Sequence, residues 1–349
     1  MENLYFKIIF LFFTSSFVTF LIVPLLIKIL TKFKILDEPS KVKIHKVEIP
    51  SMGGLAILLA VFISVPFFIH LNELSQLRSY FFACFAMMII GFRDDTKSLK
   101  PYQKLFGQIF IVILLIKYSD IEFKSFLYQY FENHEAAKIF LYILIGFFII
   151  FLTNSFNVID GIDGLACSYL ILIFCCISFW CFNVNLPIYA LTLLSIIGAL
   201  CAFWVYNWQP ARIFLGDTGS LPLGLILSTS IVIFSKFNYE LPENHPFKFY
   251  NDFSMVIGLA YLPLFDAIRV IVIRFSKKKS PFKGDKNHLH HVLLSLGLNH
   301  GQSVIFLLIM NALLIAILVL LKNSNVHYSR FFIIFYSVLL SILFYKKYH

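Results

Sequence analysis

The chain has 349 residues, of which 59% are hydrophobic and only 14% are charged, and its formal net charge is +10. This composition excludes an ordinary water-soluble domain and indicates a membrane protein. The positive charge is typical of loops beside anionic lipid headgroups, so no nucleic-acid partner is expected.

Eleven segments are apolar and long enough to be read as membrane-spanning helices, which need about 20 mostly apolar residues. They cover residues 4–27, 51–71, 77–92, 102–119, 138–153, 165–183, 187–206, 219–235, 253–273, 303–321 and 329–345. The first segment is too long for the apolar part of a signal peptide and lacks a small-residue cleavage site, so we interpret it as a retained helix. The predicted fold is therefore an all-α, polytopic membrane protein.

The basic residues set the predicted orientation. If the N-terminus lies outside and the C-terminus inside, most of the 29 Lys and Arg residues fall in inside loops, as the positive-inside rule requires. Every strongly polar motif then lies on the inside face. A transporter would bury such groups at mid-depth, whereas an enzyme that joins a charged soluble substrate to a lipid would gather them at one membrane surface.

The six cysteines lie in or beside the apolar segments and have no ligand-like spacing. We interpret them as small buried hydrophobic residues, not as disulfides or metal ligands.

The first polar motif is the acidic pair Asp94 and Asp95, which follows the third span. Adjacent carboxylates at a membrane surface repel each other unless a cation or basic partners offset them. One interpretation is a solvated turn. The other is a site that handles a divalent cation, or a proton, beside a phosphate.

The second motif places four oxygen-bearing side chains at every third position at the end of the fifth span: Asn154, Asn157, Asp160 and Asp163. In an α-helix each step of three residues turns the side chain by about 60°, so the outer pair would face opposite ways. A tighter three-residue turn would align them, and Gly161 and Gly164 permit backbone that departs from the helix. Hard oxygen ligands favour Mg²⁺ or Mn²⁺. Helix capping explains one or two of the four residues, but not all of them.

The third motif, Gly216-Asp217-Thr218-Gly219, precedes the eighth span. Its glycines and the following helix N-terminus offer backbone N–H groups to an anion, and Asp217 would hold the cation that bridges this anion. An ordinary Asp or Ser N-cap is the competing interpretation.

The fourth motif lies after the ninth span, where His288, His290 and His291 follow Lys283 and Lys286. No Cys is near, and the carboxylates of the other motifs suit a hard ion, so a zinc site is not favoured. Donors to diphosphate oxygens fit this basic loop better.

In order and spacing, the four motifs resemble the polyprenyl-phosphate N-acetylhexosamine-1-phosphate transferases, which are integral-membrane enzymes that start bacterial cell-envelope glycans. The resemblance extends over nearly the whole chain, from Asp37-Glu38-Pro39 and His45 to the His loop. It implies that a sugar 1-phosphate passes from a UDP-sugar to polyprenyl phosphate, that UMP is released, and that Mg²⁺ is required, with Mn²⁺ as a substitute. It also implies a multi-pass protein of the bacterial plasma membrane with its active site on the cytoplasmic face.

The resemblance also implies a single transmembrane catalytic domain over residues 1–349 and a role for each matching residue. Asn157 and Asp217 would contact the metal, and Asp94 would activate the lipid phosphate, with Asp95 beside it. The residues implied to bind the substrates are Lys46, Lys104, Asn154, Asp160, Asp163, His288, His290 and His291. The active-site loops would be residues 28–50, 93–104, 154–164, 207–218 and 274–302.

The lead-in Ser280-Pro281-Phe282 and the sequence His-Leu-His-His look like the branch that uses UDP-GlcNAc or a related N-acetylhexosamine. The branch that transfers phospho-N-acetylmuramoyl-pentapeptide typically has a consecutive His run followed by Phe-Glu, which is absent here; it is the alternative. Val42, Ser51 and Lys286 stand where the family commonly has Arg. Because Lys cannot reproduce the bidentate fork of Arg, these departures leave the sugar or nucleotide preference open.

The chemistry needs charge neutralisation more than a base. A phosphomonoester has a second pKa of about 6, so at pH 7 the lipid phosphate is already mostly a dianion. Direct attack by its oxygen on the sugar-bearing phosphorus, assisted by Mg²⁺, Lys and His, is therefore favoured over a covalent phospho-aspartate at Asp94. A lipid-linked sugar transporter is a distant alternative that rests on Asp266 and Arg269 within the ninth span, which can pair with each other at i, i+3. The sequence leaves the oligomeric state open, a homodimer included.

Overall fold

The computed structural model describes residues 2–37, 47–69, 75–119, 135–278 and 287–345. Nearly all of them are helical, as predicted. The helices are α1 (Glu2–Lys32), α2 (Gly54–Phe68), α4 (Arg78–Thr96), α5 (Pro101–Tyr118), α6 (Glu135–Ile159), α7 (Leu165–Asn183), α8 (Pro187–Asn207), α9 (Asp217–Glu240), α10 (Asp252–Leu259), α11 (Tyr261–Ser276), α12 (Leu289–Ser295), α13 (His300–Leu320) and α14 (Val326–Tyr345). A short 3₁₀ turn, η1 (Ser75–Leu77), and two strands, β1 (Leu36–Asp37) and β2 (Ile49–Pro50), complete the described elements.

Each of the eleven predicted spans falls on a helix, but the ninth is two helices instead of one. Within the described ranges, eight helices are long and apolar enough to cross a membrane, and the pair α10 and α11, bent by 76°, would make a ninth. Helix α2 has only 15 residues, and α5 does not belong to this set. The all-α membrane architecture is confirmed, whereas the count of eleven spans stays a prediction.

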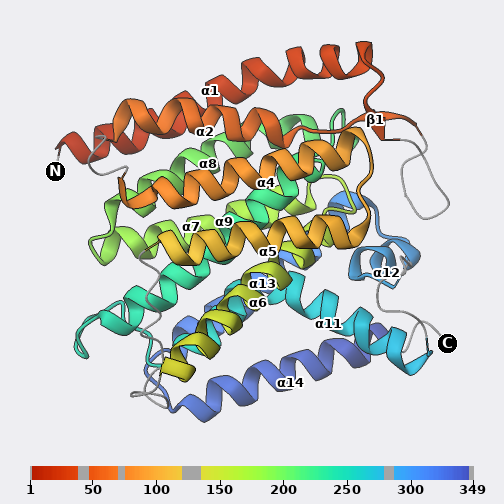
Figure 1. Cartoon of the computed structure of the whole chain (residues 1–349). Coiled ribbons are helices and arrows are strands. Elements are labelled where there is room, and N and C mark those ends of the chain that lie inside the picture. The colour runs from red at the N-terminus through yellow and green to blue at the C-terminus, as the bar shows by residue number, and fades with distance from the viewer. Residues whose placement is uncertain (1, 38–46, 70–74, 120–134, 279–286, 346–349) are drawn as a thin grey trace.

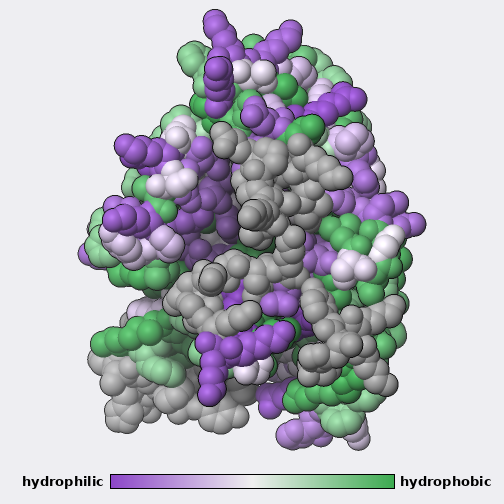
Figure 2. Space-filling view, turned by 90° about the vertical axis from the view of Figure 1, so that its right-hand side faces the viewer, coloured by the Kyte–Doolittle hydropathy of each residue, from purple (hydrophilic) through white to green (hydrophobic). Residues whose placement is uncertain are grey.

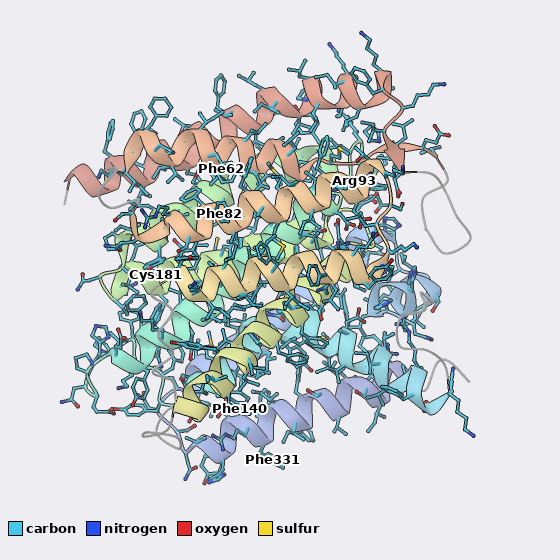
Figure 3. The ribbon with its side chains drawn as sticks, viewed as in Figure 1. Phe62, Phe82, Arg93, Phe140, Cys181 and Phe331 are labelled. Carbon is cyan, nitrogen blue, oxygen red and sulfur yellow. The ribbon has the colours of Figure 1, made fainter. Side chains whose placement is uncertain are left out.

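Helix α9 forms the centre of the bundle. Buried residues make up 94% of its apolar window, against 22% for α1 and 11% for α14. It packs against α4, α6, α2 and α10, while α1 packs on α8 and α2 (Figure 1). Phe82, Phe140 and Phe331, which Figure 3 labels on the outer helices, are exposed. Exposed aromatic and aliphatic side chains around a buried central helix are what a lipid environment permits.

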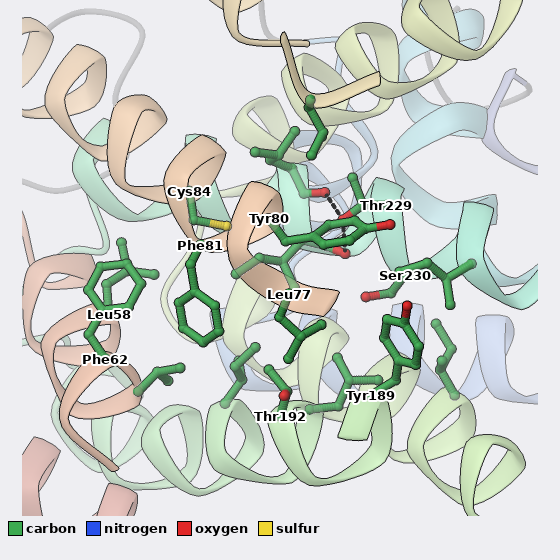
Figure 4. A pocket seen from close by; sticks show the side chains of 18 of the residues that line it. Leu58, Phe62, Leu77, Tyr80, Phe81, Cys84, Tyr189, Thr192, Thr229 and Ser230 are labelled. Carbon is green, nitrogen blue, oxygen red and sulfur yellow. Dashed lines mark hydrogen bonds between the residues drawn. The ribbon is translucent and has the colours of Figure 1, made fainter. Parts of the chain in front are cut away.

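The two ends of the bundle differ. The end of α1, the start of α2, the end of α4 and the start of α5 lie together beside β1 and α12, on the right of Figure 1. Arg93 lies at this end (Figure 3). In the opposite half, Leu77, Tyr189 and Ser230 line a small, mostly apolar cavity of about 70 Å³ (Figure 4). None of the residues of the four predicted polar motifs lines this cavity.

A short backbone ladder fixes the start of α2 to the start of α9. Strands β1 and β2 are antiparallel, with Leu36 opposite Pro50. Phe214 N donates to Pro50 O over 2.8 Å, and Gly53 N donates to Phe214 O over 2.8 Å. Because these bonds hold the segment before α9, they set the position of Asp217.

Candidate active site

The four polar motifs meet at the end of the bundle that Figure 2 faces, around a cavity of about 1510 Å³. Hydrophilic residues gather around a recess in this view. The predicted site residues that line the cavity are Asp95, Asn154, Asn157, Asp160, Asp163, Asp217, His288, His290 and His291. Lys104 lies beside them, because it contacts Asp217, and Asp94 in turn contacts Lys104. Lys46 lies outside the described residues, so its predicted role stays a prediction.

The ammonium group of Lys104 joins two carboxylates from different motifs. Its Nζ lies 3.1 Å from Asp94 Oδ2 and 2.6 Å from Asp217 Oδ2. The other oxygen of Asp94 accepts from Leu99 N over 2.6 Å. One cation therefore offsets the repulsion between the two acidic motifs, and it lies where a phosphate could bind next to them.

Asp95 caps the N-terminus of α9 from the neighbouring helix α4. Its Oδ1 accepts from Asp217 N over 2.9 Å, and its Oδ2 accepts from Thr218 N over 2.9 Å and from Thr218 Oγ1 over 2.6 Å. The close approach needs Gly91, because a Cβ there would lie 2.1 Å from Asp217 O. Gly216, with φ of +71°, lets the chain turn into the helix. Asp95 thus fixes Asp217, and its predicted part in catalysis stays a prediction.

The second motif does not form the aligned three-residue turn. Helix α6 continues as an α-helix through Asn154 and Asn157 to Ile159, and only then does the chain turn. Asn157 donates to Asp217 Oδ1 and, over 2.6 Å, to Ser220 Oγ. All four residues of the motif nevertheless line the cavity, because the turn brings the last two around its edge.

Asn154 is held by a partner on the next helix. It donates to Gln108 Oε1 over 2.7 Å and to Ile150 O over 2.8 Å, and it accepts from Gln108 Nε2 over 3.3 Å. Gln108 is fully buried. This amide pair joins α5 to α6, so Asn154 has a structural role beside its predicted contact with substrate.

Asp160 and Asp163 lie in the turn after α6 but in different surroundings. Burial, and then repulsion from Asp217 and Asp95, raises the pKa of Asp160 well above its usual value. Asp163 accepts from Ala211 N over 3.1 Å and pairs with His300 Nδ1 at 3.4 Å. Although burial alone would raise it, these bonds lower the pKa of Asp163.

The three histidines form a short stack at the start of α12. His290 is only 3% exposed, and its ring lies 5.8 Å from that of His288 and 4.4 Å from that of His291. Burial lowers the pKa of His290 to about 3, so it is neutral at pH 7. His288 Nδ1 lies 2.7 Å from Asp266 Oδ2.

The donor set fits Mg²⁺ better than a softer metal. In the part of the chain that the structure describes, no group of three or more His, Cys, Asp or Glu side chains could hold a metal ion. Mg²⁺ usually keeps several waters and binds through one or two protein groups plus substrate phosphates. Asp217 and Asn157 supply such a pair of groups, and Asp95, Asp160 and Asp163 line the same cavity, so a bound cation would offset their mutual repulsion.

One wall of the cavity is apolar and reaches the side of the bundle. Leu105 and Ile109 from α5, Phe147 and Phe151 from α6, and Phe275 from α11 line it. Leu105, Phe147 and Phe275 are also exposed on the surface. The cavity therefore joins a charged centre to the region where lipid tails would lie.

Sequence reasoning missed several residues that hold the site together. Gln108, Ser220 and His300 are isolated polar residues, and nothing in their spacing marks them. Asp266 and Arg269 were noticed only as a pair within one helix, although both bind the His loop: Arg269 Nη1 donates to Asn287 O over 2.6 Å.

Comparisons with known proteins show which family the chain resembles. The family described as glycosyl transferase family 4 matches residues 77–235. A Bacillus subtilis protein described as a probable undecaprenyl-phosphate N-acetylglucosaminyl 1-phosphate transferase is 30% identical over 97% of this chain and 91% of its own length. A phospho-N-acetylmuramoyl-pentapeptide-transferase from Staphylococcus haemolyticus is 30% identical over 80% of this chain and 88% of its own length. A phospho-N-acetylmuramoyl-pentapeptide-transferase from Staphylococcus epidermidis is 30% identical over 63% of this chain and 74% of its own length.

Proposed function

The chain belongs to glycosyl transferase family 4, and we propose that it transfers a sugar 1-phosphate from a UDP-sugar to polyprenyl phosphate and releases UMP. It is a membrane phosphotransferase of cell-envelope synthesis, as its relatives are. We propose UDP-GlcNAc or a related UDP-N-acetylhexosamine as the donor. The broader match to the Bacillus subtilis relative supports this choice over phospho-N-acetylmuramoyl-pentapeptide, which is the second candidate.

The observation that carries the proposal is the composition of the cavity wall. At one side Asp217, which is paired with Lys104, lies with the His stack in a polar centre, and at the other Phe147 and Phe275 form an apolar wall that reaches the surface. A lipid that ends in a phosphate needs both environments at once, and a nucleotide-sugar needs only the first. The same end of the bundle can therefore receive both substrates.

The reaction follows from charge. An oxygen of the lipid phosphate attacks the phosphorus that bears the sugar; the bond from this phosphorus to the bridging oxygen breaks, and UMP leaves with the electron pair. Mg²⁺ held by Asp217 and Asn157 would neutralise charge on the diphosphate oxygens. Lys104 offsets the charge of the incoming phosphate, while Asp94 and Asp217 hold the ammonium group in place. Because the lipid phosphate is mostly a dianion at pH 7, no base has to remove a proton first.

We also propose that the cavity faces the cytoplasm of a bacterial cell, because UDP-sugars are made there and the basic loops favour that side. Topology with the N-terminus outside and the C-terminus inside belongs to this proposal.

The direct test measures UMP release by the purified protein with polyprenyl phosphate, Mg²⁺ and a panel of donors that includes UDP-GlcNAc and UDP-N-acetylmuramoyl-pentapeptide. Asp217→Asn should lower the rate roughly 100-fold or more without loss of the folded protein. Glu243→Gln, a change of an exposed carboxylate at the other end of the bundle, should leave the rate unchanged. Release of UDP in place of UMP would mean transfer of the sugar without its phosphate, and the proposal would be wrong.

A further inference from the structure

One turn of α11 makes three contacts with the start of the His loop, at Asn287, His288 and Leu289. Asp266 Oδ2 lies 2.7 Å from His288 Nδ1, and Asp266 Oδ1 accepts from Leu289 N over 2.7 Å. Arg269, one turn further along the helix, donates to the carbonyl oxygen of Asn287 over 2.6 Å. Asp266 is 2% exposed and Arg269 is 9% exposed. A buried carboxylate is retained only where its bonds compensate for desolvation, and here both of its oxygens are used by the loop.

Asp266 is not among the described residues that line the cavity, but its partner His288 is. His288 lines the cavity, whereas from α11 it is Ala267, Val270, Ile271, Arg274 and Phe275 that do so. Since Asp266 binds Nδ1, the ring nitrogen that remains for the cavity is Nε2. The ring of His288 is also nearly parallel to that of His290, at an angle of 6°. A carboxylate that fixes one nitrogen of a His sets both the direction and the tautomer of the ring.

We propose that Asp266 is a positioning residue for the transfer reaction: it holds His288 so that Nε2 faces the diphosphate of the bound nucleotide-sugar, while Arg269 anchors the loop beside it. This inference rests on the proposed function, because it assumes a diphosphate in the cavity. It also gives the intramembrane acidic residue a role in an enzyme, so that Asp266 no longer supports a transporter.

The substitution Asp266→Asn separates this role from a purely structural one. The buried N–H of Leu289 still needs an acceptor, so the amide oxygen takes that place and the NH₂ group faces His288 Nδ1. A ring that carries its proton on Nδ1 cannot donate to an NH₂ group, so His288 must change tautomer or rotate. The size of the side chain and the bond to Leu289 are kept.

The experiment measures kcat and KM for UMP release in the wild type, Asp266→Asn, His288→Gln and the double variant, together with the melting temperature of each. We expect Asp266→Asn to lower kcat about 10- to 100-fold with little change in melting temperature. In the His288→Gln background, the same substitution should change kcat by less than about twofold, because residues that act through one another are not additive. The matched control is Asp252→Asn, which neutralises another buried carboxylate. Asp252 lies on α10 and accepts from Ser235 Oγ of α9 and from Phe253 N. This substitution should leave kcat unchanged.

The inference is overturned if Asp266→Asn retains kcat within about threefold of the wild type, or if the two losses multiply in the double variant. Should Asp266→Asn fail to fold, His288→Asn decides instead, because its amide can still donate to Asp266 but does not extend to the Nε2 position. That variant must fold and lose at least about 10-fold in kcat; normal activity would show that the pair only supports the fold. A wild type that releases no UMP would instead reject the proposed function itself.

Discussion

At the scale of single residues, several carboxylates of the site have oxygens that are already bound by the protein. Asp95 is the clearest case, since three donors from the first two residues of α9 bind its two oxygens. Asp95→Asn would leave one of these donors facing an NH₂ group. We expect a loss of roughly 1–3 kcal/mol in the free energy of unfolding and a lower rate of UMP release, because Asp217 loses its anchor.

A smaller change at the same contact provides the comparison. Thr218→Val removes only the hydroxyl bond and keeps both backbone donors on Asp95, so it should cost about 1 kcal/mol. Thermal unfolding of the two purified variants measures the difference. Equal stability of the two variants would contradict the capping role that we assign to Asp95.

The buried His290 predicts a pH dependence of stability. In the unfolded chain the ring binds a proton at its ordinary pKa of 6.5, whereas burial, partly offset by Asp266, lowers the pKa in the folded protein to about 3. Between these values the unfolded state holds more protons, so the free energy of unfolding falls as the pH is lowered, by at most about 1.4 kcal/mol per pH unit from this group.

His290→Gln should therefore reduce the fall in melting temperature between about pH 7 and about pH 4. In this range the unfolded chain binds a proton at His290 and the folded protein does not. His327→Gln, which changes an exposed His at the start of α14, should leave the loss unchanged. Parallel curves for the wild type and His290→Gln would show that this ring does not control the pH dependence.

At the scale of elements, the break between α10 and α11 determines where the His loop is held. Pro263 cannot donate to the carbonyl of Leu259, and its ring clashes with that carbonyl in a continuous helix. The freed groups find other partners: Leu259 O accepts from Tyr169 over 2.6 Å, and Leu262 N donates to Asn311 Oδ1 over 3.2 Å. A broken helix within a membrane is stable only if such partners exist.

Asn311→Leu tests this account, because it removes the acceptor for Leu262 N and leaves a buried donor without its bond. We expect a loss of roughly 1–3 kcal/mol in the free energy of unfolding, with lower activity because α11 carries Asp266. Asn183→Leu is the control, since Asn183 donates to the Phe179 carbonyl within its own helix and should have a smaller effect on the melting temperature. An Asn311→Leu protein as stable as that control would contradict the role of Asn311.

The same helices show how far the sequence could be interpreted. Each long apolar run correctly predicted a helix, because a membrane span can be recognised from the composition of about 20 consecutive residues, without any knowledge of their contacts. The break was not predicted, since Pro24, Pro66 and Pro222 also lie inside helices and those helices continue. Whether a Pro ends a helix depends on partners such as Asn311, which lie far away in the sequence.

The motifs of the candidate site could also be predicted from local sequence, whereas the residues that hold those motifs in place could not. Asp94, Asn157 and Asp217 stand in local patterns that the sequence displays, and the structure brings them together. Gln108 acts through its contact with Asn154, and His300 through its contact with Asp163. A contact between distant residues leaves no local pattern, so only the three-dimensional structure could reveal it.

At the scale of the whole molecule, the polar end and the apolar sides predict which face of the membrane each loop occupies. α1 begins at one end of the bundle and α14 ends at the other (Figure 1), so the described chain crosses from one side to the other. All six cysteines lie within α4, α7 and α8. They can be replaced by Ala or Ser to give a background in which single cysteines report the side of the membrane.

The exposed Lys97 lies at the end with the cavity, and the exposed Asn323 lies in the turn between α13 and α14 at the opposite end. If basic loops face the cytoplasm, a membrane-impermeant maleimide should label Asn323→Cys in intact bacterial cells and should label Lys97→Cys only after the membrane is opened. The reverse pattern would place the cavity outside, away from the cytoplasmic UDP-sugars that we propose as donors. Labelling of both positions from one side would mean that the two ends of the bundle share a membrane face, and the arrangement of its helices across the bilayer would have to be revised.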